Sequence, residues 1–344
     1  MRDDAATSMR RLEITGYGAL DRALRFNEVP IPTPGPCDLL VRIEAAAINP
    51  IDYKIVAGAL RSIQRLQFPS PIGFDGCGIV EQVGAQASGF AVGERVMLRM
   101  TRARMGSIAQ YAAVDAACVA RAPRTLDAMQ AASLPLVALT TVQGLVDRAR
   151  AVPGQRILIH AGSGGLGSFA VQYAKHVLQL RVVSTTSARN VDFVRELGAD
   201  VVIAYDREDY RARDLRYDIV FDTLGGRATA DAFGVLTRGG SVVSVAGPPD
   251  WQFAAQVGAA LPLAAAMWCM GAPMELRARL HGGRYYRYLT ESRGDQLVAI
   301  AALVDAGRLR PVIDRVFPFE QSIEALQYLA AGHARGKVVI AIAA

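Results

Sequence analysis

The sequence predicts a two-domain α/β protein, with a barrel-like domain of short antiparallel strands followed by a domain built on a parallel sheet. A chain of 344 residues is too long for one ordinary hydrophobic core. The first 130 residues contain many glycines and prolines and short β-like runs such as LLVRIEAAAI at 39–48. From about Ala131, apolar strands such as RILIHA at 156–161 alternate with helical segments such as LGSFAVQYAKHVL at 166–178. This alternation indicates a parallel sheet covered by helices on both faces.

The composition indicates a globular protein and gives little support to nucleic-acid binding. Hydrophobic residues make up 51% of the chain, charged residues make up 20%, and the formal net charge is +6. The basic residues are interleaved with acidic ones and form no dense run, so attraction of a polyanionic cofactor is the simpler use of the surplus. We therefore expect no nucleic-acid partner.

The cysteines and the N-terminal residues predict a reduced, cytoplasmic protein. Cys37, Cys77, Cys118 and Cys269 are far apart and form no CxxC pair, which disfavours a disulfide framework and a structural zinc knuckle. The first residues, MRDDAATSMRRLEITGYG, include two early acids and no apolar core. They predict neither a secretory signal nor a transit peptide.

One apolar segment has the composition of a membrane helix. The run VGAALPLAAAMWCMGAPM at 257–274 carries no charge over 18 residues. Ala and Gly make up eight of its 18 residues, and it contains Pro262 and Pro273. We expect a buried interface or the wall of a pocket here, and no membrane span.

The stretch IHAGSGGLGSFAVQYAK at 159–175 predicts a dinucleotide-binding turn. Its glycines form G-x-G-x-x-G between a predicted strand and a predicted helix. The first glycine permits the tight turn, the second lets the backbone approach the pyrophosphate, and the third lets helix and strand pack closely. A bare structural turn is the alternative. The residues expected to contact the cofactor are Gly162, Ser163, Gly164, Gly165, Leu166 and Gly167.

The end of the next predicted strand favours NADPH over NADH. NAD-specific sites place an acid there to bind the ribose 2′-hydroxyl, but no acid occurs between Val182 and Val191. Thr186 and Ser187 offer hydroxyl groups, and Arg189 offers a guanidinium that would attract a 2′-phosphate. The alternative for Arg189 is a solvated charge at a helix start.

Several ordered motifs together resemble the medium-chain dehydrogenase/reductase superfamily, in particular its zinc-free quinone oxidoreductase (zeta-crystallin-like) branch. The motifs are AAAINPIDYK at 45–54, PIGFDGCGIVEQVG at 71–84, VGERV at 92–96, the glycine turn, ELGADVVIAY at 196–205 and ARGKVVI at 334–340. The resemblance covers nearly all of residues 9–344.

This resemblance implies a GroES-like β-barrel domain with an inserted doubly wound Rossmann domain. We expect the barrel to span residues 9–130 and to be completed by 313–344, and the NADP-binding Rossmann domain to span 131–312. The family also implies a homodimer.

The resemblance further implies that this chain binds no metal. Zinc-dependent members carry a cysteine near the position of Ala47, and His-Glu where this chain has Phe74 and Asp75. Residues 97–111 contain no cysteine, so the four-cysteine lobe of those members is also missing. The histidines are isolated in the sequence, whereas a zinc site needs several ligands at fixed spacing.

The catalytic candidates follow from the family match. Asn49 and Lys54 are expected to donate hydrogen bonds to the acceptor or to the nicotinamide, and Asp52 to fix their turn. An ordinary Asn-Pro turn with Asp52 as its cap is the alternative. Thr140 resembles a threonine near the nicotinamide, with an ordinary helix hydroxyl as the alternative.

Further cofactor contacts are expected where other strands end. Tyr205 resembles a tyrosine beside the adenosine 2′-phosphate, although it also fits a core strand end. The segments DTLGG and VAGPP end two strands at the carboxyl edge of the sheet, where ligands bind in such folds, and they supply Leu224, Gly225, Ala246 and Gly247. Three tyrosines line the acceptor pocket or a dimer contact, or simply pack: Tyr285, Tyr286 and Tyr288.

These features predict a zinc-independent reductase that transfers hydride from NADPH to quinones or similar activated carbonyl compounds. Without a Lewis acid, reduction of an acceptor that is already electrophilic is the easier reaction. Enoyl thioester reductases carry a tyrosine in G-x-Y where this chain reads Gly58-Ala59-Leu60, which disfavours thioesters. The alternatives are a reductase of alkenal or enone double bonds, and a dinucleotide-binding protein with little turnover.

Overall fold

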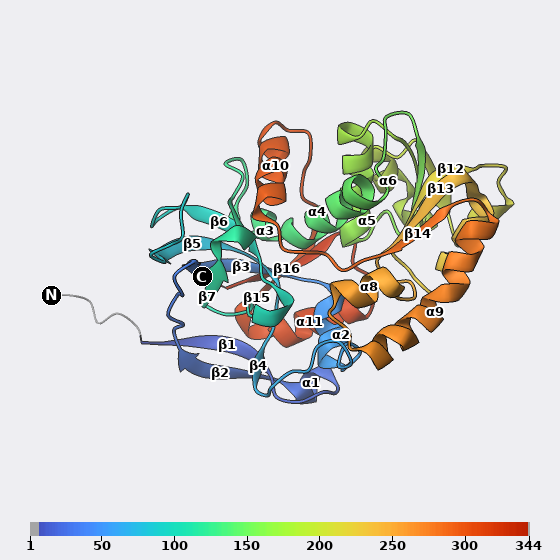
Figure 1. Cartoon of the computed structure of the whole chain (residues 1–344). Coiled ribbons are helices and arrows are strands. Elements are labelled where there is room, and N and C mark those ends of the chain that lie inside the picture. The colour runs from blue at the N-terminus through green and yellow to red at the C-terminus, as the bar shows by residue number, and fades with distance from the viewer. Residues whose placement is uncertain (1–6, 343–344) are drawn as a thin grey trace. The chain divides into compact units, whose positions relative to one another are not determined.

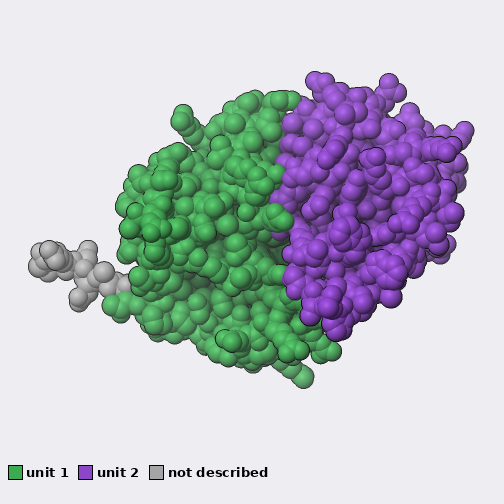
Figure 2. Space-filling model, in the orientation of Figure 1, with its two compact units in different colours: residues 1–139, 291–344 green, residues 140–290 purple. Residues whose placement is uncertain are grey.

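The computed structural model describes residues 7–342, which divide into two compact units (Figures 1 and 2). Unit 1 comprises Met1–Leu139 and Glu291–Ala344, and unit 2 comprises Thr140–Thr290. The predicted class, a GroES-like domain with an inserted Rossmann-like parallel sheet, is confirmed. Residues 1–6, which belong to the N-terminal segment read for targeting signals, lie outside the described residues.

The division between the units differs from the boundaries expected at residues 130 and 312. It falls after Leu139 and after Thr290. Helix α3 (Ala128–Ala132) packs on β3 (Asp38–Ile48) and β5 (Asp75–Val83), and α10 (Gly294–Asp305) packs on β8 (Val119–Arg121). These helices read as part of an α/β alternation in the sequence, but their packing partners are barrel strands.

Unit 1 is built from two sheets. The larger, seven-stranded sheet has the order β15-β16-β3-β5-β6-β8, with β7 paired to β3. Its remaining strands are β6 (Arg95–Arg99), β7 (Tyr111–Asp115), β15 (Ile313–Pro318) and β16 (Lys337–Ala341). The smaller sheet has the order β2-β1-β4, from β1 (Ser8–Ile14), β2 (Leu24–Pro30) and β4 (Ser70–Pro71). Strand β16 pairs antiparallel with β3, so the last strand of the chain completes a sheet begun near its start.

The helices of unit 1 are short and connect or cover these strands. They are α1 (Leu20–Ala23), α2 (Pro50–Val56), α3, the first part of α4 (Pro135–Val142), α10 and α11 (Ser322–Ala330), with 3-10 turns at Arg102–Arg104, Ala116–Cys118 and Phe319–Gln321. Helix α4 crosses the division, and its residues from Thr140 onward belong to unit 2. Helix α2 begins directly after β3, because Pro50 has the fixed φ of a first helical position and Asp52 accepts from the backbone N–H of Asn49.

Unit 2 contains one six-stranded sheet in which every pairing is parallel. The strands are β9 (Arg156–Ile159), β10 (Arg181–Thr186), β11 (Val201–Ala204), β12 (Tyr217–Asp222), β13 (Leu236–Ser244) and β14 (Arg284–Arg287). Their order is β11-β10-β9-β12-β13-β14. The order reverses between β9 and β12, and the carboxyl ends at such a switch point form the ligand-binding crevice of doubly wound sheets.

Helices connect the strands of unit 2. They are α5 (Gly165–Gln172), α6 (Val191–Glu196), α7 (Arg227–Ala232), α8 (Trp251–Gln256) and α9 (Leu261–Leu280). Single-turn or π segments lie at Gln143–Arg148, Tyr173–Val177, Ala188–Asn190, Tyr210–Ala212 and Phe233–Val235. The parallel strands carry buried apolar side chains such as Leu158, Val183 and Val220, which agrees with their continuous apolar runs.

The apolar segment 257–274 begins just after α8 and forms a turn and most of α9, which is the long orange helix in Figure 1. Only one side of α9 is buried, at Met267, Gly271 and Ala278. Trp268 is 54% exposed, so the segment is not a wall buried within its own unit.

A different helical stretch, Ala128–Arg148, is long and apolar enough by composition to cross a membrane, and 72% of its most apolar window is buried inside the protein. That degree of burial is typical of a core helix.

Candidate functional site

The glycine turn lies between β9 and α5, as the sequence predicted, and its glycines serve different purposes. A Cβ on Gly162 would lie 2.1 Å from Oγ of Ser184, and one on Gly167 would lie 2.1 Å from the carbonyl oxygen of Ala161. A Cβ on Gly164 meets only that same carbonyl oxygen, at 3.4 Å. Gly162 and Gly167 are therefore required by packing, whereas the space beside Gly164 is left for a ligand approaching the start of α5.

Ser163, at the tip of the turn, is tethered to the end of β10. Its Oγ accepts from Oγ1 of Thr186 at 2.9 Å and from Nδ2 of Asn190 at 3.2 Å. Asn190 also donates to Oγ of Ser187 at 3.2 Å. Asn190 was not among the predicted residues, although it follows the strand end by only four positions.

The position of Thr186 corrects one expectation. Its side chain is fully buried and its hydroxyl is used by Ser163. Thr186 therefore shapes the glycine turn and does not present a hydroxyl to a ribose. The reason is that the sheet is covered on both faces, so the last residue of a central strand is buried whichever way it points.

Arg189 and Tyr205 lie at the ends of the neighbouring strands β10 and β11. Arg189 is exposed and has no side-chain partner among residues 7–342. Tyr205 is 64% exposed, and its backbone N–H donates to the carbonyl oxygen of Thr186 at 2.9 Å. Asp206 is held nearby, since its Oδ1 accepts from the N–H of Ala188. Both predicted side chains are thus available to a ligand, beside an acid that the sequence interpretation did not weigh.

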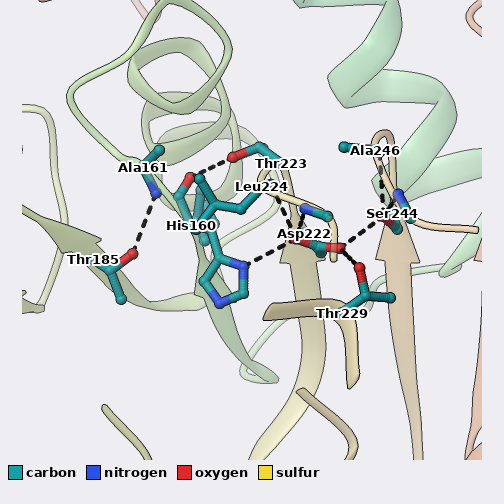
Figure 3. Close-up of polar contacts among 12 residues, drawn as sticks. His160, Ala161, Thr185, Asp222, Thr223, Leu224, Thr229, Ser244 and Ala246 are labelled. Atoms are coloured by element: carbon teal, nitrogen blue, oxygen red, sulfur yellow. Dashed lines mark hydrogen bonds and ion pairs between the residues drawn. The ribbon is translucent and has the colours of Figure 1, made fainter. Parts of the chain in front are cut away.

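A single buried carboxylate connects the strand ends at the centre of the sheet (Figure 3). Oδ1 of Asp222, at the end of β12, accepts from the backbone N–H groups of Leu224 and Gly225, each at 3.0 Å. Nδ1 of His160, at the end of β9, lies 3.3 Å from the same oxygen. These hydrogen bonds hold the pKa of Asp222 well below its usual range, although burial acts in the opposite direction.

The other oxygen of Asp222 reaches the next strand. Oδ2 accepts from Oγ1 of Thr229 and from Oγ of Ser244 at 2.7 Å. Oγ of Ser244 in turn accepts from the backbone N–H groups of Ala246 and Gly247, at 3.2 and 2.7 Å. One carboxylate therefore orders the ends of β9, β12 and β13, including the predicted loop residues.

The loop residues and tyrosines of unit 2 have distinct environments. Leu224 is 58% exposed, whereas a Cβ on Gly225 would lie 2.5 Å from the carbonyl oxygen of Ala246. Tyr285 is buried and donates to the carbonyl oxygen of Pro248 at 2.7 Å. Tyr288 is buried as well, so packing is the role of both tyrosines.

Thr140 is buried within unit 2 and fully hydrogen-bonded there. Its Oγ1 lies 2.7 Å from Oγ1 of Thr290, and its carbonyl oxygen accepts from the hydroxyl of Tyr288 at 2.6 Å. Only 2% of Thr140 is exposed. The geometry matches the alternative of an ordinary, satisfied helix hydroxyl.

In unit 1, Asn49 is tied to the barrel from every side. Its backbone N–H donates to Oδ2 of Asp52 at 2.7 Å, and its Nδ2 donates to Oδ2 of Asp75 at 2.9 Å. Its Oδ1 accepts from Nζ of Lys337. Because Asn49 is only 2% exposed, its amide is not free to donate to an acceptor, which differs from the expectation. Lys54 lies exposed on the last turn of α2 without a side-chain partner among the described residues.

Asp52 is fully buried at the start of α2, where it closes the turn. Burial raises its pKa to about 7, although the hydrogen bond from Asn49 opposes this change. Its second oxygen, Oδ1, has no hydrogen-bond partner within the part of the chain that the structure describes. Asp52 thus faces the interior of unit 1 and not a ligand.

The residues around Asn49 do not fit a zinc ion. The guanidinium of Arg99 lies 5.5 Å from the ring of Phe74, and Nζ of Lys337 lies 3.5 Å from Oδ2 of Asp75. Two buried cations repel a divalent cation, and a zinc site needs thiolate or imidazole ligands. Across residues 7–342, no group of three or more His, Cys, Asp or Glu side chains could hold a metal ion.

Comparisons with known proteins agree with this architecture. Residues 35–124 match the family model of the alcohol dehydrogenase GroES-like domain, and residues 197–340 match the one described as zinc-binding dehydrogenase. The chain is 32% identical to a chloroplastic quinone-oxidoreductase homolog of Spinacia oleracea, covering 98% of this chain and 99% of the relative. It is 30% identical to a chloroplastic NADPH-dependent alkenal/one oxidoreductase of Arabidopsis thaliana, covering 96% and 79%.

The structure of the quinone oxidoreductase from Coxiella burnetii has the same fold. It superposes with a TM-score of 0.85 at 28% identity, covering 98% of this chain and all of that one. The expected cytoplasmic location is wrong on these comparisons, because both plant relatives are chloroplastic proteins.

The geometry of the turn predicts different results for two glycine substitutions. Gly164→Val should fold normally but weaken NADPH binding by about 100-fold or more, because the side chain occupies the approach of the pyrophosphate and removes charge-assisted hydrogen bonds worth roughly 3 kcal/mol. The measurement is a fluorescence titration with NADPH beside a thermal melt. Gly167→Ala is the control for a substitution that disturbs packing. It should lower the melting temperature relative to the wild type, because its Cβ would collide with the carbonyl oxygen of Ala161. Wild-type affinity in a folded Gly164→Val variant would refute this role of the turn.

Proposed function

The chain belongs to the medium-chain dehydrogenase/reductase superfamily, among its quinone oxidoreductases, and from this membership we propose that it is an NADPH-dependent, zinc-independent reductase of quinones and similar activated carbonyl compounds. It is an oxidoreductase that uses a nicotinamide cofactor. We propose in addition that the cofactor is NADPH, that zinc takes no part in the reaction, and that the acceptor is a quinone or a similar activated carbonyl compound.

The observation that carries the proposal is the set of side chains around Asn49. By the resemblance, the zinc ligands of metal-dependent members fall near Ala47 and at Phe74 and Asp75. In this chain, the ammonium of Lys337 contacts Asn49 and Asp75, and the guanidinium of Arg99 lies over the ring of Phe74. Within residues 7–342, no group of three or more His, Cys, Asp or Glu side chains is placed to hold a Lewis acid that would polarise an alcohol. Reduction of an acceptor that is already electrophilic does not require one.

The residues of unit 2 then bind and orient the cofactor. The N–H groups at the start of α5 suit the pyrophosphate, and Asp222 holds the loops after β12 and β13 in fixed positions. When bound, the dihydronicotinamide supplies the hydride. Fixed loops leave positioning as the main contribution of the protein.

NADPH is favoured over NADH by two features of the β10 end. No acid occurs between Val182 and Val191, and Arg189 is exposed without a side-chain partner among the described residues. A free guanidinium suits a 2′-phosphate. The Arabidopsis relative is itself NADPH-dependent. Asp206 lies close to this position and does not occupy the guanidinium.

A second candidate function is the reduction of the carbon–carbon double bond in alkenals and enones. It is favoured by the similarity to the alkenal/one oxidoreductase, which is comparable to the similarity to the quinone-oxidoreductase homolog. Both acceptor classes are electrophiles that accept hydride without a metal.

A homodimer is also part of the proposal, formed through α9 and the edge strand β14. In the described sheet β14 pairs only with β13, so its outer edge is open to another strand. Next to it, α9 exposes Leu261, Trp268, Met270, Leu276 and Leu280. An open strand edge beside a large exposed apolar helix face suits a second copy of the same surface.

The proposed activity is tested by NADPH oxidation against a panel of quinones, enones and aldehydes, with and without EDTA. We expect turnover of quinones or enones, little turnover of simple aldehydes, and no effect of the chelator. NADPH binding without turnover of any acceptor would indicate a binding protein. Stoichiometric zinc whose removal abolishes turnover would contradict the proposed chemistry.

The role of Arg189 is tested by Arg189→Ala. Loss of charge-assisted bonds worth roughly 1.5–3 kcal/mol should raise the NADPH dissociation constant by about 10- to 100-fold and leave NADH nearly unchanged. The control is Arg195→Ala, an exposed arginine on α6 paired with Asp192, which should change neither. Equal weakening of both cofactors by Arg189→Ala would show that it does not read the 2′-phosphate.

The proposed dimer is tested by sedimentation velocity. Trp268→Glu should convert the protein to monomers, because a buried carboxylate without a partner is costly at an interface. Val298→Glu, at an exposed apolar residue of α10, is the matched control and should leave the dimer intact. A wild-type protein that sediments as a monomer at micromolar concentration would exclude this assembly.

A further inference from the structure

Two acidic and two basic side chains are buried together in unit 1. They are Asp52 on α2, Asp75 on β5, Arg99 on β6 and Lys337 on β16. Each is at most 6% exposed. Burying single charges costs several kcal/mol each unless they are paired and hydrogen-bonded, so their arrangement must be specific.

Lys337 occupies the centre of this cluster. Its Nζ donates to the carbonyl oxygen of Ile48 at 3.3 Å, to Oδ1 of Asn49, and to Oδ2 of Asp75 at 3.5 Å. All three donors of an ammonium therefore have acceptors. The acceptors come from the end of β3, the first residue before α2, and the start of β5.

The backbone conformation at Gly336 determines the position of the Lys337 side chain. Gly336 has φ +109°, and a Cβ on it would lie 2.6 Å from the carbonyl oxygen of Val312. The N–H of Lys337 donates to that same carbonyl oxygen at 2.8 Å. The glycine lets β16 begin against this segment, which sends the following lysine side chain into the interior.

The cluster also fixes the beginning of α4. Oδ1 of Asp75 accepts from the backbone N–H of Leu136 at 3.0 Å, while its Oδ2 accepts from Asn49 and Lys337. A helix of which one N-terminal N–H is satisfied by a carboxylate is held in place and stabilised. Lys337 therefore connects β16, the β3–α2 corner and, through Asp75, the first turn of α4.

We propose that Lys337 is a positioning residue for the reduction, whose buried ammonium holds the β3–α2 corner directly and the start of α4 through Asp75. This inference rests on the proposed function. Lys337 does not touch acceptor or cofactor, and it acts through Asn49 and Asp75. In this arrangement the Asn49 amide has a structural role and does not donate directly to the acceptor.

The charge of Lys337 has a consequence for the pH dependence. Burial raises the pKa of Asp52 and of Asp75, while Lys337 and Arg99 act to lower both. Without the ammonium both carboxyl groups would bind protons at higher pH than in the wild type. An ionised Asp75 accepts more strongly than a protonated one from Asn49 and from the N–H of Leu136, so the acidic limb of the activity profile should move to higher pH when Lys337 is replaced by a neutral residue.

The test compares Lys337→Met and Lys337→Arg in the full chain. Lys337→Met should lower kcat by roughly 10- to 100-fold, because small displacements of positioned groups have effects of this size. Its NADPH dissociation constant should stay at the wild-type value, and its acidic limb should move to higher pH. Lys337→Arg keeps the charge and should restore part of kcat and the wild-type limb. Lys175→Met, at a half-exposed lysine paired with Asp200 in unit 2, is the control and should change neither quantity.

A second variant keeps the test decisive if Lys337→Met does not fold. Lys337→Met combined with Asp75→Asn removes both charges of the pair, which is far less costly than leaving one buried charge alone. The double variant should fold, bind NADPH and still lose turnover. Full turnover in a folded variant without the ammonium overturns the inference alone. Absence of turnover in the wild type overturns the proposed function, and this inference with it.

Discussion

The carboxylate of Asp222 is the interaction on which the order of the cofactor-binding edge depends. It is completely buried at the end of β12, a position that would be costly for an unpaired charge. Backbone N–H groups, hydroxyl groups and a histidine ring offset this cost by surrounding it with donors. Since these donors belong to loops from β9, β12 and β13, satisfying one charge forces several loops into a single arrangement.

The same physical principle operates in unit 1 with different chemistry. There two buried cations lie close to the buried carboxylates, and the ammonium of Lys337 holds the β3–α2 corner in place. In both units, a buried charge with several partners specifies loop positions that apolar packing alone would leave less defined. The protein supplies fixed geometry, and the nicotinamide supplies the reactivity.

Local patterns in the sequence were sufficient for the fold class and for the glycine turn. The alternation of apolar strands and helices from about Ala131 predicts the parallel sheet, and the spacing of Gly162, Gly164 and Gly167 identifies the switch-point strand β9. The lack of an acid at the β10 end and the presence of Arg189 there are likewise local features of the sequence. Thr186 was misread, because a hydroxyl residue at a strand end gives no indication of which side chains cover it.

Contacts between distant parts of the chain explain what the sequence did not predict. Lys337 lies 288 positions from Asn49, and no periodicity connects them. Asp222 had a local signal, an acid that ends the apolar run YDIVFD, but its partners on β9 and β13 appear only when the sheet forms. The composition of 257–274 predicts an interface or a pocket wall, but it does not show that the chain itself leaves this face of α9 uncovered, as it is in the structure.

The most direct test of this account is a NADPH titration of Asp222→Asn. The substitution keeps the shape but replaces one acceptor oxygen by a donor that faces the hydroxyls of Thr229 and Ser244. Asp218→Asn is the matched control, at the opposite end of the same strand, where Asp218 accepts from Arg156 and Thr237. We predict that Asp222→Asn stays folded and binds NADPH roughly 10- to 100-fold more weakly, whereas Asp218→Asn binds it normally. Wild-type affinity in a folded Asp222→Asn variant would contradict the account.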